Sequence, residues 1–433
     1  MANKLSTTDS GFDKDFANLL GQKRETDADV NTTVANILQD VRARGDLAVI
    51  EYTNKFDRLS MTSGADLRVS AEEISAAVTQ CDGETLDALK IAAKRIEAYH
   101  VKQKPEDLRY EDEEGIELGY RWNAIEQVGL YVPGGLATYP SSVLMNAVPA
   151  KVAGADRLVM VVPTPDGIIN PLVLAAADLC GVDEIYRIGG AQAVAALAYG
   201  TDTIVAVDKI VGPGNAYVAT AKKQVFGTVG IDMIAGPSEI LVVADNKNDA
   251  AWIAADLLSQ AEHDPVAQSI LITDDAGFAE SVEDAIQFHL KTLDRAEIAS
   301  KSWKDYGAII ILRNMNEAAA LVDQIAPEHL ELCVDDPETL AGEIRHAGAI
   351  FMGRYTPEAI GDYIAGPNHV LPTARTARFS SGLSTLDFMK RSSLIKLNAT
   401  GLRKIGPPAI KLAQSEGLDA HALSIAVRLN MSQ

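Results

Sequence analysis

The run Leu158-Val-Met-Val-Val162 is short and wholly apolar, and runs of the same kind recur along the chain. Alanine-rich segments with helical spacing separate these runs. A short apolar run followed by such a segment, several times over, predicts a parallel sheet with crossover helices. The expected strands are residues 128–132, 158–162, 184–188 and 209–211, and the expected helices are residues 171–179, 191–199 and 215–225.

A second series of the same make-up follows, so the chain is expected to form two parallel sheets. No sequence repeat is visible that would support a duplication. The strands of this series are expected at residues 239–244, 269–273, 308–312, 330–334 and 349–352, with helices that include residues 250–262 and 276–289.

Helical patterns flank the two series. Residues 30–104 show apolar residues three and four apart, and Pro105 ends that pattern. After residue 380 the pattern is again helical, with one helix expected to open at Pro407-Pro408 and a last one at residues 419–429. A helical tail in this position is free to reach a partner subunit.

The composition is that of a folded globular protein. Of 433 residues, 47% are hydrophobic and 23% are charged, which excludes disorder as the main state and suggests roughly two to four domains. The 39 basic and 60 acidic residues give a formal net charge of −21. Nucleic acid and anionic membrane surfaces are therefore disfavoured as partners.

The cysteine content and the N-terminus point to the cytoplasm. Three widely spaced cysteines do not suit a disulfide framework, and they indicate a reducing compartment. Residues 1–10 lack the apolar segment of a secretory signal. No apolar run reaches the ~18–20 residues of a membrane-spanning helix.

Four glycine-rich turns adjoin expected strands. Glycine there lets backbone N–H groups approach a ligand, and helix N-termini favour anions. The turns are either ordinary tight turns or the walls of a ligand crevice, and none matches G-x-G-x-x-G. A dinucleotide would therefore bind weakly and in an unusual way. The turns contain Gly134-Gly135, Gly189-Gly190, Gly212-Pro-Gly214 and Gly236-Pro-Ser238.

Two groups of polar residues could hold a metal ion. Gln260 and His263 are three apart at the end of an expected helix and so share one face. Asp362 and His369 flank a Gly-Pro turn. A mixed nitrogen and oxygen set suits Zn²⁺, although a polar helix surface would show the same spacing.

Glu328 and His329 are adjacent titratable residues. Neighbours in a regular strand face opposite ways, so both can serve one site only where the backbone turns, as Pro327 allows. Histidine is the natural general base at neutral pH, and the carboxylate could activate water. The alternative is a capped helix end with a solvated glutamate. His421, with Glu416 nearby, reads by itself as a surface or interhelical histidine.

Taken together, these segments resemble the L-histidinol dehydrogenase family from about residue 30 to the C-terminus. Seven blocks in the same order carry the resemblance: Gly129-Leu-Tyr-Val-Pro-Gly-Gly135, Gly189-Gly-Ala-Gln-Ala193, Gly212-Pro-Gly-Asn215, Ala235-Gly-Pro-Ser-Glu239, Asp256-Leu-Leu-Ser-Gln-Ala-Glu-His-Asp264, Ala326-Pro-Glu-His-Leu-Glu331 and Gly361-Asp-Tyr with Asn368-His-Val-Leu-Pro-Thr373.

The resemblance implies an NAD-dependent, zinc-containing homodimer that oxidises L-histidinol to L-histidinal and then to L-histidine, the last steps of histidine biosynthesis. It implies that Glu328 activates water in the second oxidation and that His329 is the acid–base of the first. The implied zinc ligands, which with His329 also line the substrate site, are Gln260, His263, Asp362 and, from the other subunit, His421. Ser238, His369 and Glu416 match substrate contacts, and Tyr131, Gln192 and Asn215 match cofactor contacts.

The resemblance also implies an α/β fold with two incomplete Rossmann-like domains and small helical extensions at both ends. We expect an N-terminal helical arm at 1–30, a first α/β domain at 31–127 and 237–380 with most metal and catalytic residues, an NAD-binding α/β domain at 128–236, and a helical domain at 381–433 that reaches the partner.

Three rival functions are weighed against this one. The nearest is a zinc-dependent dehydrogenase of another small alcohol, such as a sulfonated diol, which would lack the Glu328-His329 pair or the imidazole contacts. A zinc hydrolase would need no nicotinamide. A metal-stabilised dimer without activity would need no base beside the metal.

Overall fold

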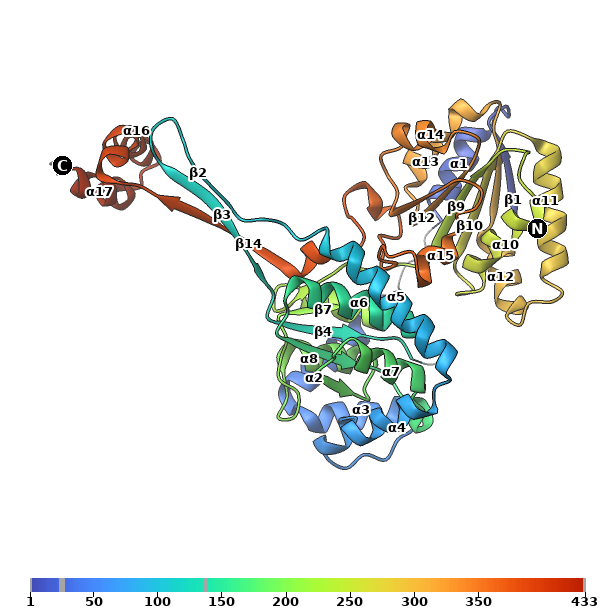
Figure 1. Ribbon diagram of the computed structural model, residues 1–433, viewed down its shortest axis with the longest axis horizontal. Coiled ribbons are helices and arrows are strands. Elements are labelled where there is room, and N and C mark those ends of the chain that lie inside the picture. Colours follow the sequence, from blue (N-terminus) through green and yellow to red (C-terminus); the bar gives the residue numbers. More distant parts are fainter. Residues whose placement is uncertain (1, 23–27, 135–138, 431–433) are drawn as a thin grey trace.

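The computed structural model describes residues 2–22, 28–134 and 139–430, and it has two α/β bodies and a long arm (Figure 1). The predicted α/β fold with parallel sheets is confirmed. Gly135, the last residue of the first glycine-rich turn, lies outside the described residues. None of the helices in the described ranges is long and apolar enough to cross a membrane.

The first body is built on a five-stranded parallel sheet in the order β6-β5-β4-β7-β8. Helices cover both faces, as an all-parallel sheet requires. Its strands are β4 (Gln127–Tyr131), β5 (Arg157–Val161), β6 (Glu184–Tyr186), β7 (Lys209–Val211) and β8 (Gly230–Ile231). The helices α6 (Pro140–Ala153) and α7 (Pro171–Leu179) pack on one face, and α8 (Gly190–Tyr199) and α9 (Ala216–Val225) on the other.

Four earlier helices complete the cover of this same sheet, which differs from the predicted division into domains. Val41 and Val49 pack with Val159 on one face, and Ile96 packs with Leu130 on the other. Residues 31–101 therefore belong with residues 128–236, not with residues 237–380. The helices are α2 (Ala28–Arg44), α3 (Asp46–Asp57), α4 (Ala71–Gln80) and α5 (Gly83–Val101).

The second body has a six-stranded parallel sheet in the order β1-β11-β10-β9-β12-β13. Without the edge strand β1, this order matches that of the five-stranded sheet, so the two predicted series form equivalent sheets. The strands are β1 (Asn3–Ser6), β9 (Glu239–Ala244), β10 (Gln268–Thr273), β11 (Ala308–Ile311), β12 (His329–Cys333) and β13 (Ala349–Met352). The flanking helices are α1 (Phe12–Leu20), α10 (Ala250–Ala261), α11 (Ala276–His289), α12 (Ala296–Tyr306), α13 (Ala318–Ile325) and α14 (Pro337–Glu343).

The N-terminus is part of this second body, which corrects the predicted helical arm at residues 1–30. Strand β1 pairs in parallel with β11, from Asn3 opposite Ala308 to Ser6 opposite Ile311. Helix α1 then buries Phe16 and Leu19 against the same core. The described part of the N-terminal segment is therefore a strand and a packed helix.

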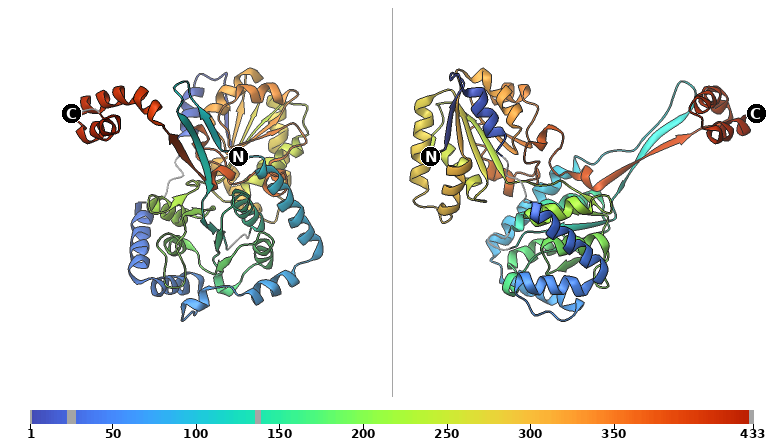
Figure 2. Two further views of the ribbon diagram at one scale, coloured as in Figure 1. Left: turned by 60° about the vertical axis from the view of Figure 1, so that its left-hand side comes forward. Right: turned by 180° about the vertical axis from the view of Figure 1, so that it is seen from behind.

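The arm is residues 108–124 and 389–430, and it projects from the bodies (Figures 1 and 2). Its shaft is an antiparallel ribbon of β2 (Leu108–Glu111), β3 (Glu117–Ala124) and β14 (Met389–Lys396). Its tip is α16 (Ala399–Ser415) and α17 (Asp419–Ala426). The prediction of helix alone after residue 380 missed β14, and the helix expected to open at Pro407-Pro408 begins earlier, where Asn398 accepts hydrogen bonds from Thr400 and Gly401.

Candidate active site

The polar residues of the second body gather at the amino ends of two neighbouring strands, β9 and β12. Glu239 opens β9 and His329 opens β12, and these strands are paired in parallel. The Glu239 backbone N–H donates to Glu328 Oε2 over 2.9 Å, and the Glu239 carbonyl lies 2.9 Å from His329 Nδ1. One residue of β9 thus holds both members of the Glu-His pair.

A residue in the left-handed backbone conformation makes this arrangement possible. Ala326 ends α13 with φ of 49°, a conformation that costs a non-glycine residue about 1 kcal/mol. The chain turns there and passes through Pro327, so Glu328 and His329 reach the same neighbour although they are adjacent. The structure therefore has the turn that the sequence made plausible, and it buries Glu328 instead of leaving it solvated.

The environment sets the proton positions of the pair. Burial raises the pKa of Glu328 well above its usual value. The hydrogen bond from the Glu239 N–H lowers this pKa, and the negative charges of Glu239, Asp362 and Glu358 raise it further. Burial lowers the pKa of His329, so its neutral form is favoured. A carbonyl only accepts, so Nδ1–H must donate to Glu239 and Nε2 keeps the lone pair.

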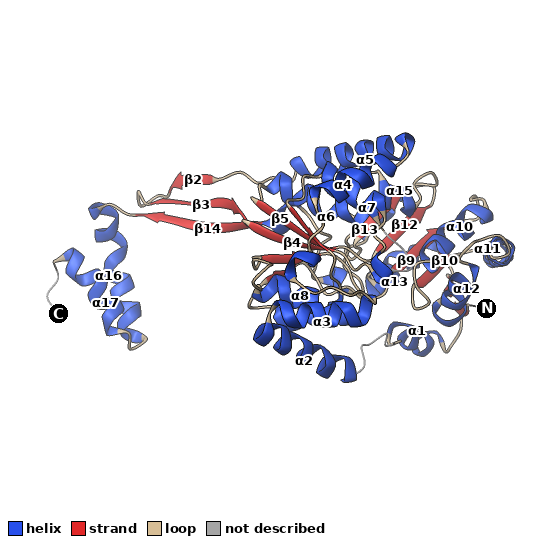
Figure 3. Cartoon of the chain, turned by 90° about the horizontal axis from the view of Figure 1, so that it is seen from below, coloured by secondary structure: helices blue, strands red, loops and turns tan. Residues whose placement is uncertain are grey.

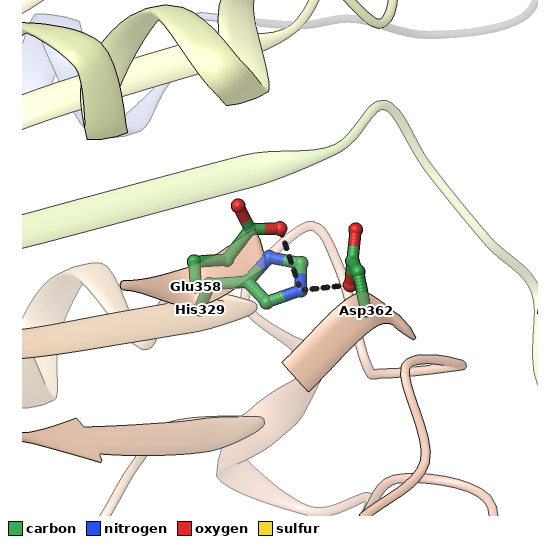
Figure 4. A group of neighbouring side chains, drawn as sticks. All are labelled: His329, Glu358 and Asp362. Carbon is green, nitrogen blue, oxygen red and sulfur yellow. Dashed lines mark ion pairs between the residues drawn. The ribbon is translucent and has the colours of Figure 1, made fainter. Parts of the chain in front are cut away.

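Helix α15 (Glu358–Tyr363) brings two carboxylates to that free nitrogen (Figure 4). His329 Nε2 lies 3.6 Å from Glu358 Oε1 and 3.8 Å from Asp362 Oδ1, and it has no hydrogen-bond partner among the described residues. Glu358 is buried, and its N–H donates to Glu331 Oε1 over 2.6 Å. Sequence reasoning missed Glu358; its spacing of four from Asp362 on one helix was the available signal.

The end of α10 supplies an amide and a second imidazole. Gln260 Nε2 and His263 Nδ1 are 3.1 Å apart. The Gln260 side chain is fully buried, and its Oε1 has no hydrogen-bond partner within the described ranges. Arg295 donates to the Glu262 and His263 carbonyls and so fixes this turn.

His369 connects the two bodies. Its Nδ1 lies 3.1 Å from the Asp362 carbonyl, and its Nε2 lies 3.4 Å from Ser142 Oγ. Ser142 belongs to α6 of the first body, and the Tyr139 ring just before α6 meets the His263 ring at 6.5 Å between centroids. The site therefore lies between the amino edge of the six-stranded sheet and the start of α6.

This set of donors fits a divalent metal ion. Ligand atoms of His329, Glu358 and Asp362 all lie within 4.8 Å of one another. Gln260 and His263 form a second group. Burial lowers the pKa of His369, and nearby Asp362 opposes this fall while nearby His263 adds to it. Neutral imidazole, carboxylate and amide oxygen are a mixed set suited to Zn²⁺, and a buried unpaired Gln260 oxygen is what such a site needs before its ion binds.

The opposite, carboxyl edge of the six-stranded sheet does not suit an anionic ligand. A cavity of about 290 Å³ lies there, beyond the ends of β9, β10 and β12. Its carboxylates would repel the pyrophosphate of a dinucleotide. The acidic residues that line it are Asp245, Asp274, Asp335, Asp336 and Glu343.

The expected cofactor residues lie at the carboxyl edge of the five-stranded sheet. Tyr131 ends β4, and its hydroxyl accepts a hydrogen bond from the Gly190 N–H at the start of α8. Gln192 is buried on α8, and no described residue pairs with its Oε1. Asn215 caps α9 by accepting from the N–H groups of Tyr217 and Val218.

Two expected residues lie elsewhere in the chain. Glu416 and His421 are at the tip of the arm, far from α15 (Figure 1). Ser238 directly precedes β9, and its carbonyl accepts from the Gln268 N–H. Of the expected ligand set, one chain therefore gathers Gln260, His263 and Asp362, but not His421.

Comparison with known proteins settles the family. The family model for histidinol dehydrogenase matches residues 20–429. The chain belongs to the histidinol dehydrogenase family. Relatives of that name include one from Rhodospirillum rubrum, 65% identical over 431 residues, and one from Ruegeria pomeroyi, 62% identical over 430 residues, each alignment covering 99% of both chains.

A solved structure of a histidinol dehydrogenase, from Elizabethkingia anophelis, has the same fold. It superimposes with a TM-score of 0.94 at 37% identity, covering 99% of this chain and 98% of that one. The histidinol dehydrogenase family consists of NAD-dependent oxidoreductases that use zinc, so this chain is an enzyme of that class. The rival dehydrogenase of another small alcohol finds no support.

Proposed function

We propose that the chain oxidises L-histidinol to L-histidinal and then to L-histidine at the site between the two bodies, as the last steps of histidine biosynthesis. The observation that carries the proposal is the buried Nε2 of His329, which has no hydrogen-bond partner among the described residues, beside the buried Glu328. The pair offers one base for an alcohol and another for a water molecule.

His329 serves the first oxidation. Its Nδ1–H is held by the Glu239 carbonyl, so Nε2 faces the site with its lone pair. This nitrogen accepts the hydroxyl proton of histidinol while the hydride leaves for the nicotinamide of NAD. Burial keeps His329 neutral and therefore ready to accept that proton.

Glu328 serves the second oxidation. The aldehyde must take up water before a second hydride can leave, and a carboxylate activates that water. Burial raises the pKa of Glu328, which makes its ionised form a stronger base than an exposed carboxylate. Glu328 Oε2 lies 3.7 Å from His329 Nδ1, so the two side chains are neighbours at one site.

We assign the zinc to Gln260, His263, Asp362 and His421 of the partner subunit. The unpaired Gln260 oxygen supports this choice over the group of His329, Glu358 and Asp362, because a metal on His329 Nε2 would occupy the lone pair of the base. A zinc ion on these residues would supply a fixed point of coordination that orients the substrate. With zinc on this set, Glu358 is not a ligand and stays beside His329.

The arm supports the proposal of a homodimer with shared sites. Glu416 and His421 lie too far along the arm to serve their own chain's site, so we place them in the site of a second copy (Figure 3). There they join Ser238 and His369 as substrate contacts.

The three cysteines are free, and together with the biosynthetic role this supports a cytoplasmic enzyme.

The cofactor binds at the carboxyl edge of the five-stranded sheet, on Tyr131, Gln192 and Asn215. Gly212 follows β7 with φ of 112°, and a Cβ there would lie 2.1 Å from the Tyr131 carbonyl oxygen. This close approach of two loops shapes the edge where the nicotinamide enters. The turn needs glycine for packing as well as for its backbone conformation.

Gly212→Ala should therefore raise the KM for NAD about tenfold, the equivalent of about 1.4 kcal/mol. Gly227→Ala is the matched control, because Gly227 has a similar φ of 104° but a Cβ at that position would meet nothing within 4 Å. Both variants should lose stability through backbone strain of about 1–2 kcal/mol. Equal KM values for NAD in the two variants would show that the Gly212 contact does not shape the cofactor site.

The function itself is tested by counting NADH. With L-histidinol limiting and NAD in excess, we expect two NADH for each histidinol, with L-histidine as the product. Removal of metal by a chelator should abolish the reaction, and added zinc should restore it. One NADH for each histidinol, or full activity after verified metal removal, would contradict the proposed function.

A further inference from the structure

The root of the arm is residues 384–388, which include the short 3₁₀ helix η5 (Thr385–Phe388) and lead directly into β14. Thr385 and Phe388 are fully buried. The Thr385 hydroxyl donates to the His100 carbonyl over 2.8 Å, and its N–H donates to Gln103 Oε1 over 3.0 Å. The Ile125 N–H donates to the Phe388 carbonyl over 2.8 Å. The root is therefore tied to α5 and to the chain between β3 and β4.

A buried lysine ties the root to the five-stranded sheet as well. Lys209 opens β7, and its Nζ donates to the Asp387 carbonyl over 2.5 Å. The same nitrogen lies 3.8 Å from Asp387 Oδ1 and 5.9 Å from the centre of the Phe388 ring. A buried cation is costly unless it is paired, so the contacts with Asp387 and Phe388 stabilise the Lys209 ammonium group in this position. It lies at the opposite end of β7 from Gly212, away from the proposed cofactor contacts.

The shaft of the arm converts any rotation of the root into a displacement of the tip. Strands β14 and β3 pair without a break from Met389 opposite Ala124 to Lys396 opposite Glu117. Eight residues of strand span roughly 26 Å, so a rotation of about 10° at the root moves the far end by roughly 4–5 Å. Most side chains of β14 are exposed, and the ribbon stands clear of both bodies (Figure 2). The direction of the arm is therefore set at its root.

We propose that Lys209, through Asp387, is a positioning residue for the site of the partner subunit, because it sets the direction of the arm that carries Glu416 and His421. The inference rests on the proposed sharing of sites in a homodimer. Metal–ligand distances tolerate errors of only about 0.2 Å. A chain that loses the contact between Lys209 and Asp387 should therefore weaken the zinc site of the other chain. The five-stranded sheet of its own chain, which binds the cofactor, should stay intact.

The test uses mixed dimers of two differently tagged chains, one of which carries His329→Asn so that only the other chain oxidises L-histidinol at its normal rate. Lys209→Met is placed either in the His329→Asn chain, whose arm serves the live site, or in the live chain. In the first arrangement we expect at least a tenfold rise in the KM for histidinol and easier loss of zinc to a chelator. In the second arrangement both values at the live site should stay normal.

Two further variants make the result specific. Lys209→Arg should restore the KM and the zinc affinity, because it keeps the cation at the root. In each arrangement, the affinity for NAD, measured by titration without histidinol, should not change. If Lys209→Met does not fold, Lys209→Gln takes its place because it also removes the cation, with the same expected dependence on which chain carries it.

His421→Ala in the same two arrangements separates failure of the inference from failure of the proposed function. If His421→Ala acts only from the opposite chain but Lys209→Met acts on its own chain, or on neither chain, the positioning role of Lys209 is refuted. If His421→Ala itself acts on its own chain, the sharing of sites is wrong, and the inference falls with it.

Discussion

Replacing His329 with asparagine should slow the oxidation of L-histidinol by about 10²–10⁴-fold, the usual contribution of a general acid–base. The asparagine amide can still donate to the Glu239 carbonyl, as Nδ1–H of His329 does, so the local fold should survive. What is lost is the basic nitrogen Nε2, which has no partner among the described residues. Oxidation of supplied L-histidinal should fall much less, since Glu328 serves that step.

The measurement is the initial rate of NADH formation from each substrate, with His346→Asn as the control. His346 lies outside the site, where its backbone N–H donates to Asp323. Both rates should be normal in the control. An equal loss of both rates in His329→Asn would refute the division of labour between His329 and Glu328.

Replacing Glu328 with glutamine should have the opposite effect on the two steps. Glutamine has the same size, and its oxygen can accept the hydrogen bond from the Glu239 N–H that Glu328 accepts now. It cannot activate water, so oxidation of supplied L-histidinal should fall by about 10²–10⁴-fold. The alcohol step, measured as NADH-dependent reduction of L-histidinal, should keep most of its rate.

Glu343→Gln is a matched control, because Glu343 lies at the acidic cavity on the opposite edge of the same sheet. It should leave both directions unchanged. A Glu328→Gln variant that loses the reduction of L-histidinal as fully as its oxidation would show that Glu328 acts in the alcohol step as well, or only holds the site together.

The two sheets were predictable because most of their strands are buried on both faces. The expected strands at residues 209–211, 239–244 and 349–352 have the same bounds as β7, β9 and β13. The arm could not be predicted in this way. Strand β14 is exposed along most of its length, so no apolar alternation marks it. Helices α2–α5 pack on the sheet whose faces the other helices leave partly uncovered. The order of the elements in the sequence does not reveal which sheet that is.

The residues alone marked the two pairs of the site as candidates, and the family resemblance decided between the alternatives. Pro327 made it plausible that Glu328 and His329 serve one site, and the spacing placed Gln260 and His263 on one helix face. A capped helix end and a polar helix surface stayed open until the resemblance was considered. Glu358 was missed although it is spaced four residues from Asp362, because its importance comes from the fold, which places it 3.6 Å from His329. The glycine-rich turns that follow strands lie at the carboxyl edge of the five-stranded sheet, whereas the six-stranded sheet offers its amino edge to the site.

The most direct test of the central claim is to locate zinc by anomalous X-ray scattering in crystals of the zinc-loaded enzyme. The claim is that the two bodies of one chain and the arm of another build one site. We expect a single peak per chain about 2.0–2.2 Å from Gln260 Oε1, a His263 ring nitrogen, an Asp362 carboxylate oxygen and a ring nitrogen of His421 of the partner subunit. A peak bonded instead to His329 Nε2 and Glu358, with no ligand from a second chain, would contradict it.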